Sequence, residues 1–134
     1  MRRLISILLI LTLIPLASAI EVIEETTKTY SIPNINGADI SIVRSNYDPL
    51  PAEPGKYVDI WITVQNYGSN EVKNSYLKLN PEYPFYLTGK DTGVEYIKTL
   101  QPGGLKILEY RLLVDEQAIG SEYPLELKFC QDEF

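Results

Sequence analysis

Alternation of apolar and polar residues is the dominant pattern along this chain. In the stretch 57–66, the apolar residues Val58, Ile60, Ile62 and Val64 occupy every second position, and polar residues fill most of the positions between them. A period of two is typical of a strand that is buried on one face. The stretch is therefore predicted to be a central strand of a sheet.

Turn-forming residues bound this strand on both sides. Pro51 and Pro54 have a fixed φ and no backbone donor, and Gly55 tolerates positive φ, so the segment before the strand is expected to turn rather than to form a helix. After the strand, the segment 66–70 (Asn-Tyr-Gly-Ser-Asn) is rich in residues that accept left-handed backbone and reverse the chain. The chain is therefore expected to form hairpins and crossovers between short strands.

Similar patterns predict six further strands, at 38–46, 71–79, 83–87, 94–100, 105–114 and 121–130. The strand 105–114 is the second long one, and is expected to pair with 57–66 or to lie opposite it. Pro84 cannot donate to a ladder, which places the strand 83–87 at a sheet edge. About seven short strands, with no helical period after the amino-terminal region, predict an all-β fold with two sheets packed as a sandwich. A barrel is the alternative.

The amino-terminal segment has the organisation of a secretory signal peptide. Arg2 and Arg3 precede the apolar run 4–16, and the small residues Ala-Ser-Ala follow at 17–19. A helical signal peptide cleaved after Ala19 is predicted. The alternative is a retained membrane anchor, although a helix over 4–19 would reach only about 24 Å, short of the roughly 30 Å hydrocarbon core of a bilayer.

Removal of residues 1–19 would leave 115 of the 134 residues, which is enough for one domain. The expected organisation is a signal peptide (1–19), a tether or edge strand (20–37), the sandwich (38–130) and a polar tail (131–134). Loss of Arg2 and Arg3 would change the net charge from −6 to −8. This acidic balance argues against nucleic acid or an anionic membrane surface as partner.

Few residues of the chain suit catalysis. Histidine is absent, which removes the commonest general base and metal ligand. Cys130 is the only cysteine, so it is either a free thiol or joins two chains. The carboxylate pairs Asp48 with Glu53 and Asp115 with Glu116 match no calcium-loop spacing. An enzyme is not expected, and no catalytic residue, cofactor or metal site is predicted.

Aromatic side chains are the more informative feature. The chain has ten tyrosines and one tryptophan, and tyrosine suits both sugar stacking and protein interfaces. Trp61 lies opposite the Val58 face by parity. The alternative is that some of these rings plug the ends of the sandwich and others are ordinary strand formers. The predicted contact surface consists of Trp61, Tyr83, Phe85, Tyr86 and Tyr96.

The turns and core positions also resemble a known family. The resemblance is carried by Tyr47-Asp-Pro, Pro54-Gly55, the segment 58–68, Leu-Gln-Pro-Gly-Gly at 100–104, the segment 110–115 and Gly-Ser-Glu-Tyr-Pro-Leu at 120–125. Over residues 38–130 the chain resembles the archaeal S-layer-like domain family. This resemblance implies an exported immunoglobulin-like sandwich of the kind found beside cell-adhesion and carbohydrate-active domains.

The expected function is therefore that of a non-enzymatic, secreted or cell-surface module that makes protein–protein contacts in the cell envelope. One alternative is a carbohydrate-binding module, for which Trp61, Tyr83 and Tyr86 would have to line one exposed plane. Another is an accessory or inhibitor subunit of a secreted enzyme, for which the loops 89–93 and 101–104 would have to project together at one end. A membrane contact is expected only if the signal segment is retained as an anchor.

Overall fold

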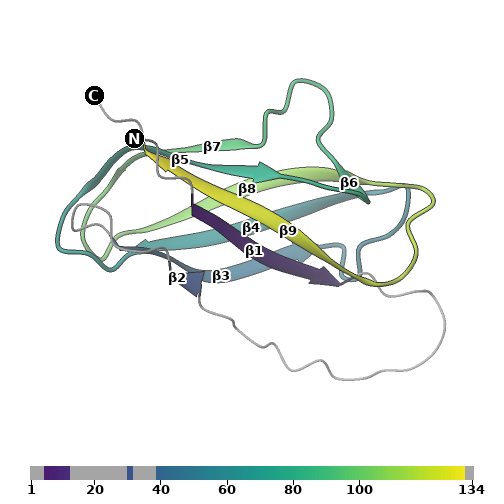
Figure 1. Ribbon diagram of the computed structural model, residues 1–134, viewed down its shortest axis with the longest axis horizontal. Coiled ribbons are helices and arrows are strands. Elements are labelled where there is room, and N and C mark those ends of the chain that lie inside the picture. The colour runs from purple at the N-terminus through teal and green to yellow at the C-terminus, as the bar shows by residue number, and fades with distance from the viewer. Residues whose placement is uncertain (1–4, 13–29, 32–38, 132–134) are drawn as a thin grey trace.

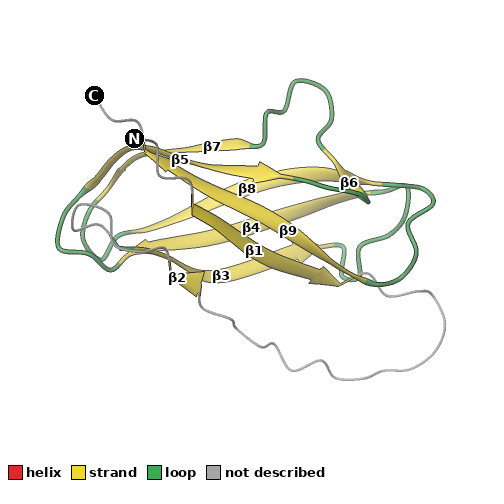
Figure 2. Ribbon diagram, in the orientation of Figure 1, coloured by secondary structure: helices red, strands yellow, loops and turns green. Residues whose placement is uncertain are grey.

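The computed structural model describes residues 5–12, 30–31 and 39–131, and every regular element in these ranges is a β-strand. Figures 1 and 2 show the strands in two layers. Their bounds are β1 (Ile5–Thr12), β2 (Tyr30–Ser31), β3 (Ile40–Asp48), β4 (Tyr57–Asn66), β5 (Val72–Asn80), β6 (Phe85–Tyr86), β7 (Val94–Leu100), β8 (Leu105–Val114) and β9 (Glu122–Gln131). Over these same ranges there is no helix of the length and apolar character needed to cross a membrane.

The strands form two antiparallel sheets. One has the order β1-β9-β5-β7 and the other the order β2-β3-β4-β8-β6. The two long strands β4 and β8 pair directly, from Tyr57 opposite Leu113 to Gln65 opposite Leu105. The short strand β6 lies at the edge beside β8, as Pro84 predicted. The all-β fold with two antiparallel sheets is thus confirmed.

The hydrophobic core lies between the two sheets. The even-numbered residues of β4 and β8 and the odd-numbered residues of β9 point inward, as their alternation predicted. The fully buried side chains include Val58, Ile60, Ile62, Leu77, Leu79, Phe85, Ile97, Leu108, Leu112, Leu125 and Leu127. Each such side chain contributes about 1.5–3 kcal/mol of transfer free energy. No intramolecular disulfide is available to a chain with one cysteine, so this packing carries the stability.

A β-bulge in β3 changes which residues face the core. The pairing of β3 with β4 shifts by one position between Ile42 and Arg44. Tyr47 consequently pairs with Ile60 and packs against the core, although it is an odd number of residues from Ile42. The strand continues to Asp48, two residues beyond its predicted end, because these residues still pair with β4.

The expectation of a helical signal segment is wrong for the residues described at the amino terminus. Ile5–Thr12 forms strand β1, which pairs with β9 along its whole length. An unbroken apolar run does not by itself distinguish a helix from a strand, because it lacks the periodicity of either. Within the predicted tether, Tyr30–Ser31 forms the edge strand β2 beside β3. Residues 1–4, 13–29, 32–38 and 132–134, which include the predicted cleavage site and most of the tail, lie outside the described residues.

Candidate contact surface

The outer face of the five-stranded sheet carries an unusual number of apolar side chains. A sheet face turned to solvent normally carries polar residues, yet Ile107, Leu105 and Tyr57 there are 65%, 60% and 51% exposed. Tyr86, 43% exposed, lies on the same face at the edge strand. Trp61 and Leu113 are partly buried on the same face. We call this set the contact face: Tyr57, Trp61, Tyr86, Leu105, Ile107 and Leu113.

The strand register determines which of these side chains are neighbours. Leu113 of β8 lies between Tyr57 of β4 and Tyr86 of β6, which makes one apolar row across three strands. Adjacent strands are about 4.8 Å apart, so these three side chains can form a continuous apolar surface. Ile107 lies one strand from Thr63, towards the other end of the face.

An ion pair lies on the contact face beside the row formed by Tyr57, Leu113 and Tyr86. Arg111 Nε and Nη2 donate to the two carboxylate oxygens of Asp59, at 2.6 and 2.7 Å. The hydrogen bond from Arg111 lowers the pKa of Asp59 below its ordinary value. The Arg111 guanidinium also lies over the Tyr57 ring, 5.8 Å from its centroid. Arginine and tyrosine held in fixed geometry are characteristic of protein interfaces.

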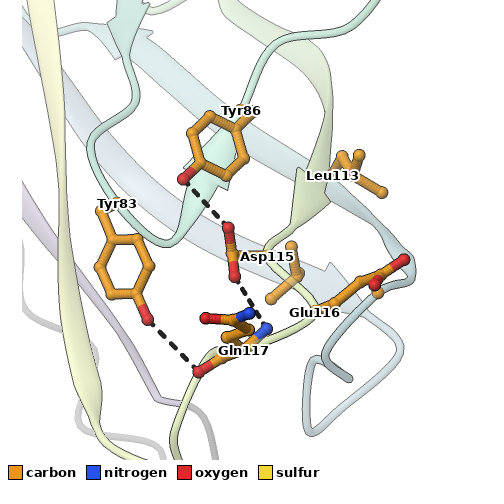
Figure 3. Close-up of a pocket in the computed structure, with 8 residues that line it drawn as sticks. Tyr83, Tyr86, Leu113, Asp115, Glu116 and Gln117 are labelled. Carbon is orange, nitrogen blue, oxygen red and sulfur yellow. Dashed lines mark hydrogen bonds between the residues drawn. The ribbon is translucent and has the colours of Figure 1, made fainter.

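A shallow depression adjoins the contact face beside β6 (Figure 3). It has a volume of about 430 Å³, and it is lined by Gly55, Tyr83, Tyr86, Leu113, Val114, Asp115, Glu116 and Gln117. The Tyr86 hydroxyl donates to Asp115 Oδ2 at 3.1 Å, and the backbone N–H of Gln117 donates to Asp115 Oδ1 at 2.8 Å. Partial desolvation of its hydroxyl raises the pKa of Tyr86, and the Asp115 carboxylate raises it further. The depression is therefore a recess bordered by fixed polar groups.

Two of the five predicted contact residues, Trp61 and Tyr86, lie on the contact face. Both residues pair with β8: Trp61 is opposite Glu109 and Tyr86 is opposite Leu113, four residues further along that strand. That offset corresponds to roughly 13 Å along the strand. Tyr83 borders the depression, and its hydroxyl donates to the carbonyl oxygen of Gln117 at 3.4 Å.

The other two predicted contact residues lie elsewhere. Phe85 is 1% exposed and packs edge-to-face against Tyr123, with centroids 6.2 Å apart, so its assignment to a surface is wrong. Its neighbour in the ladder, Val114, faces the core, and Phe85 must face the same way. Tyr96 is exposed but lies on β7 in the other sheet, against Tyr76. The five residues therefore do not form one surface.

Leu105 and Ile107 were not predicted as contact residues, although the alternation along the strand 105–114 indicates that they face outward. Once Leu108, Tyr110 and Leu112 are assigned to the core, the odd-numbered positions of the same strand must face outward. Leu105 and Ile107 occupy two of these positions. An apolar residue on the otherwise polar face of a predicted strand is the sequence signal that indicates such a contact surface.

The loops required for an inhibitor do not project together. The loop 89–93 precedes β7 and the turn 101–104 follows it. They lie at opposite ends of β7, as Figure 1 shows. The seven residues of β7 separate them by about 23 Å. The structure therefore lacks the joint projection of these two loops that an inhibitor or accessory subunit was expected to need.

Across residues 39–131, no three acidic or cysteine side chains are grouped so as to hold a metal ion. Nor does that range contain a buried side-chain nitrogen or oxygen atom without a hydrogen-bond partner. Of the two candidate carboxylate pairs named from the sequence, the second includes Asp115, which accepts hydrogen bonds from the Tyr86 hydroxyl and the Gln117 N–H.

Comparison with known proteins gives two relatives. The chain is 36% identical over 97 residues to the uncharacterized protein MJ1506 of Methanocaldococcus jannaschii and 37% identical over 90 residues to the uncharacterized protein MJ1561 of the same archaeon. These matches cover 70% and 65% of this chain but only 22% and 16% of the relatives. No family model and no solved structure matches the chain. It thus resembles a module-sized part of two longer archaeal proteins.

Proposed function

We propose that this chain is a non-enzymatic module of the archaeal cell surface, S-layer-like in character, which binds a protein partner in the cell envelope through the contact face. The observation that carries the proposal is the exposure of Tyr57, Leu105 and Ile107 on one sheet face. Exposed apolar side chains together with aromatic residues and an ion-paired arginine on one face match the composition of a protein interface.

The strand connections support an immunoglobulin-like topology for this module. Strands β4 and β5 lie in different sheets, as do β7 and β8, and β8 and β9. Such repeated crossing between two antiparallel sheets is typical of that class of sandwich. It leaves both outer sheet faces available for contacts, which suits a module that works by binding.

The order of charged, apolar and small residues over 1–19 supports export of the chain. The proposed location is the cell surface or the extracellular medium, with residues 1–19 removed. The similarity to parts of two longer archaeal proteins supports a modular role, because the matched segments have the size of one domain.

A protein partner is favoured over a glycan by the spacing of the aromatic residues. A sugar ring stacks on one aromatic side chain or on two adjacent ones, whereas Trp61 and Tyr86 are roughly 13 Å apart along the strand direction. The Asp59–Arg111 ion pair lies between these two rows of the ladder, and aromatic residues around a paired arginine are better matched to a protein surface.

Cosedimentation with isolated cell envelopes of the source organism tests the proposal. The chain 20–134, labelled at its amino terminus, is expected to bind saturably, and Ile107→Lys is expected to weaken binding at least tenfold. Tyr96→Lys is the matched control, because Tyr96 is 61% exposed on the opposite sheet and should not matter.

Treatment of the envelopes separates the two classes of partner. Proteolysis should abolish binding and enzymatic removal of glycans should leave it intact. Equal loss from both variants, or binding that survives proteolysis but not glycan removal, would reject a protein partner on the contact face.

A further inference from the structure

The outer edge of β9 is covered by a segment that export would remove. All eight residues of β1 pair antiparallel with β9, from Ile5 opposite Phe129 to Thr12 opposite Glu122. The same residues form the apolar part of the predicted signal peptide. Cleavage after Ala19 would therefore leave this edge without its neighbouring strand.

Residues 39–131 form a hydrophobic core that lies within the exported chain. Among these residues the core cluster extends from Ile40 to Phe129. On its other side, β9 stays paired with β5, from Ser75 opposite Gln131 to Asn80 opposite Glu126. The chain 20–134 therefore keeps this core cluster and the pairing of β9 with β5, while the backbone groups along one edge of β9 become available.

An open edge of this length is a template for another strand. Leu125, Leu127 and Phe129 of β9 face the core, whereas Glu126 and Lys128 face outward. A strand added beside β9 would extend the same two faces. Main-chain hydrogen bonds would supply affinity, and alternate side chains of the added strand would supply specificity.

We propose that the β9 edge of the exported protein accepts an extended, apolar segment of a partner protein, antiparallel to β9 and in the register that β1 holds. This inference rests on the proposed function, because it requires that residues 1–19 be removed. The occupant is defined by the strand seated there, Ile-Ser-Ile-Leu-Leu-Ile-Leu-Thr, in which six of eight residues are leucine or isoleucine.

A second copy of this chain is a poor occupant by comparison. Its own β9 alternates apolar and charged residues and contains Pro124, which has no donor for a ladder. The net charge of −8 that remains after loss of Arg2 and Arg3 also disfavours self-association. A partner that donates an apolar strand faces neither obstacle.

Peptide binding tests the proposal directly. The probe is a fluorescent peptide of residues 4–13 with three lysines added at each end for solubility. Fluorescence anisotropy is expected to show saturable binding to the chain 20–134, and binding at least tenfold weaker to the full chain 1–134, whose β9 edge is covered. A peptide with proline at alternate positions is the control for ladder formation.

Disulfide trapping tests the register. In a Cys130→Ser background, a peptide with cysteine at position 6 is expected to cross-link to Lys128→Cys, because Ser6 pairs with Lys128. Glu126→Cys is the matched control, since it points to the same side but lies two residues out of register. A peptide with cysteine at position 8 should show the reverse preference, because Leu8 pairs with Glu126.

The inference would be overturned if the peptide did not bind saturably to a chain 20–134 whose near-ultraviolet circular dichroism shows a packed core. Equal peptide binding to the chains 20–134 and 1–134 would also overturn it, as would equal cross-linking at positions 126 and 128. A stable dimer with protected β9 amides would assign the edge to a second copy instead. Two other measurements report failure of the proposed function. The mass of the exported protein would show that residues 1–19 are retained, or the binding to cell envelopes would be unchanged by Ile107→Lys. Ile107→Lys should leave peptide binding unchanged.

Discussion

The side-chain amide of Asn66 donates a 3.0 Å hydrogen bond to the carbonyl oxygen of Leu100 and so joins the end of β4 in one sheet to the end of β7 in the other. The same nitrogen donates to the carbonyl oxygen of Asn70 at 2.8 Å, and the Asn66 side-chain oxygen accepts from the N–H of Gly68 at 2.9 Å. The residue is fully buried. One polar side chain therefore fixes the turn after β4 and links the two sheets.

Asn66→Ala is expected to lower the free energy of unfolding by about 2–4 kcal/mol, because it leaves buried backbone groups unpaired. Asn66→Asp should also destabilise, since a carboxylate retains the acceptor for Gly68 but cannot donate to Leu100. Urea unfolding followed by circular dichroism measures both. Asn46→Ala, at an exposed position of β3, is the control and should change stability by less than about 0.5 kcal/mol. A loss below about 1 kcal/mol for Asn66→Ala would contradict the buried network.

Tyr110 provides a second link between the sheets and a pH dependence. Its buried hydroxyl donates to the carbonyl oxygen of Leu77 in the opposite sheet at 3.2 Å. Burial raises its pKa well above the ordinary value, and the negative charges of Glu95 and Asp91 raise it further. Because the folded state favours the protonated phenol, this contribution to stability is complete below the unfolded pKa of about 10 and is lost as the pH rises above it.

Urea unfolding at neutral pH and at several values above pH 10 is the corresponding measurement. Tyr110→Phe is expected to lose about 1 kcal/mol near neutrality and to show a shallower fall in stability at alkaline pH than the wild type. Tyr96→Phe removes an exposed hydroxyl and serves as the control. An unchanged alkaline slope in Tyr110→Phe would show that Tyr110 is not responsible.

Gly93 and Gly89 form a matched pair for a test of backbone packing. Both have a φ of +67°, in the region that L side chains rarely adopt, but only Gly93 has close neighbours. A Cβ at Gly93 would lie 2.6 Å from the carbonyl oxygen of Leu79, whereas a Cβ at Gly89 meets nothing within 4 Å. Gly89→Ala is expected to cost about 1–2 kcal/mol for the left-handed backbone. Gly93→Ala should cost a further 1–3 kcal/mol, roughly, because the loop must shift. Equal losses in urea unfolding would show that the close approach is not a constraint.

The strand bounds and the inward-facing residues of single strands could be predicted from the sequence. The bounds of β4, β7 and β8 agree with the predicted ranges, because alternation and turn residues are properties of neighbouring positions. The inward faces of β4, β8 and β9 followed from the same parity. Pro84 correctly placed a strand at an edge, since a missing N–H excludes it from the middle of a sheet.

Features that depend on pairing between strands far apart in the sequence could not be predicted from local patterns. Trp61 and Tyr96 both lie on outward faces, but which sheet each strand joins is decided by pairing across the chain. The bulge near Ile42 moves Tyr47 to the core side, and no local signal marks it. The pairing of β1 with β9 joins residues more than a hundred positions apart. The contact face needed both the parity of single strands and the assignment of β4, β6 and β8 to one sheet.

Trp61 gives the simplest spectroscopic test of the contact face, because it is the only tryptophan. It lies partly buried on the outer face, opposite Asn46 on one side and Glu109 on the other. Acrylamide, a neutral quencher, is therefore expected to quench its fluorescence less than that of free tryptophan but clearly more than that of a core residue. Iodide should quench it less than acrylamide does, because Glu109 and the net negative charge of the protein repel the anion. Glu109→Gln should raise quenching by iodide and leave quenching by acrylamide unchanged. Complete protection from acrylamide would place Trp61 in the core and remove it from the contact face.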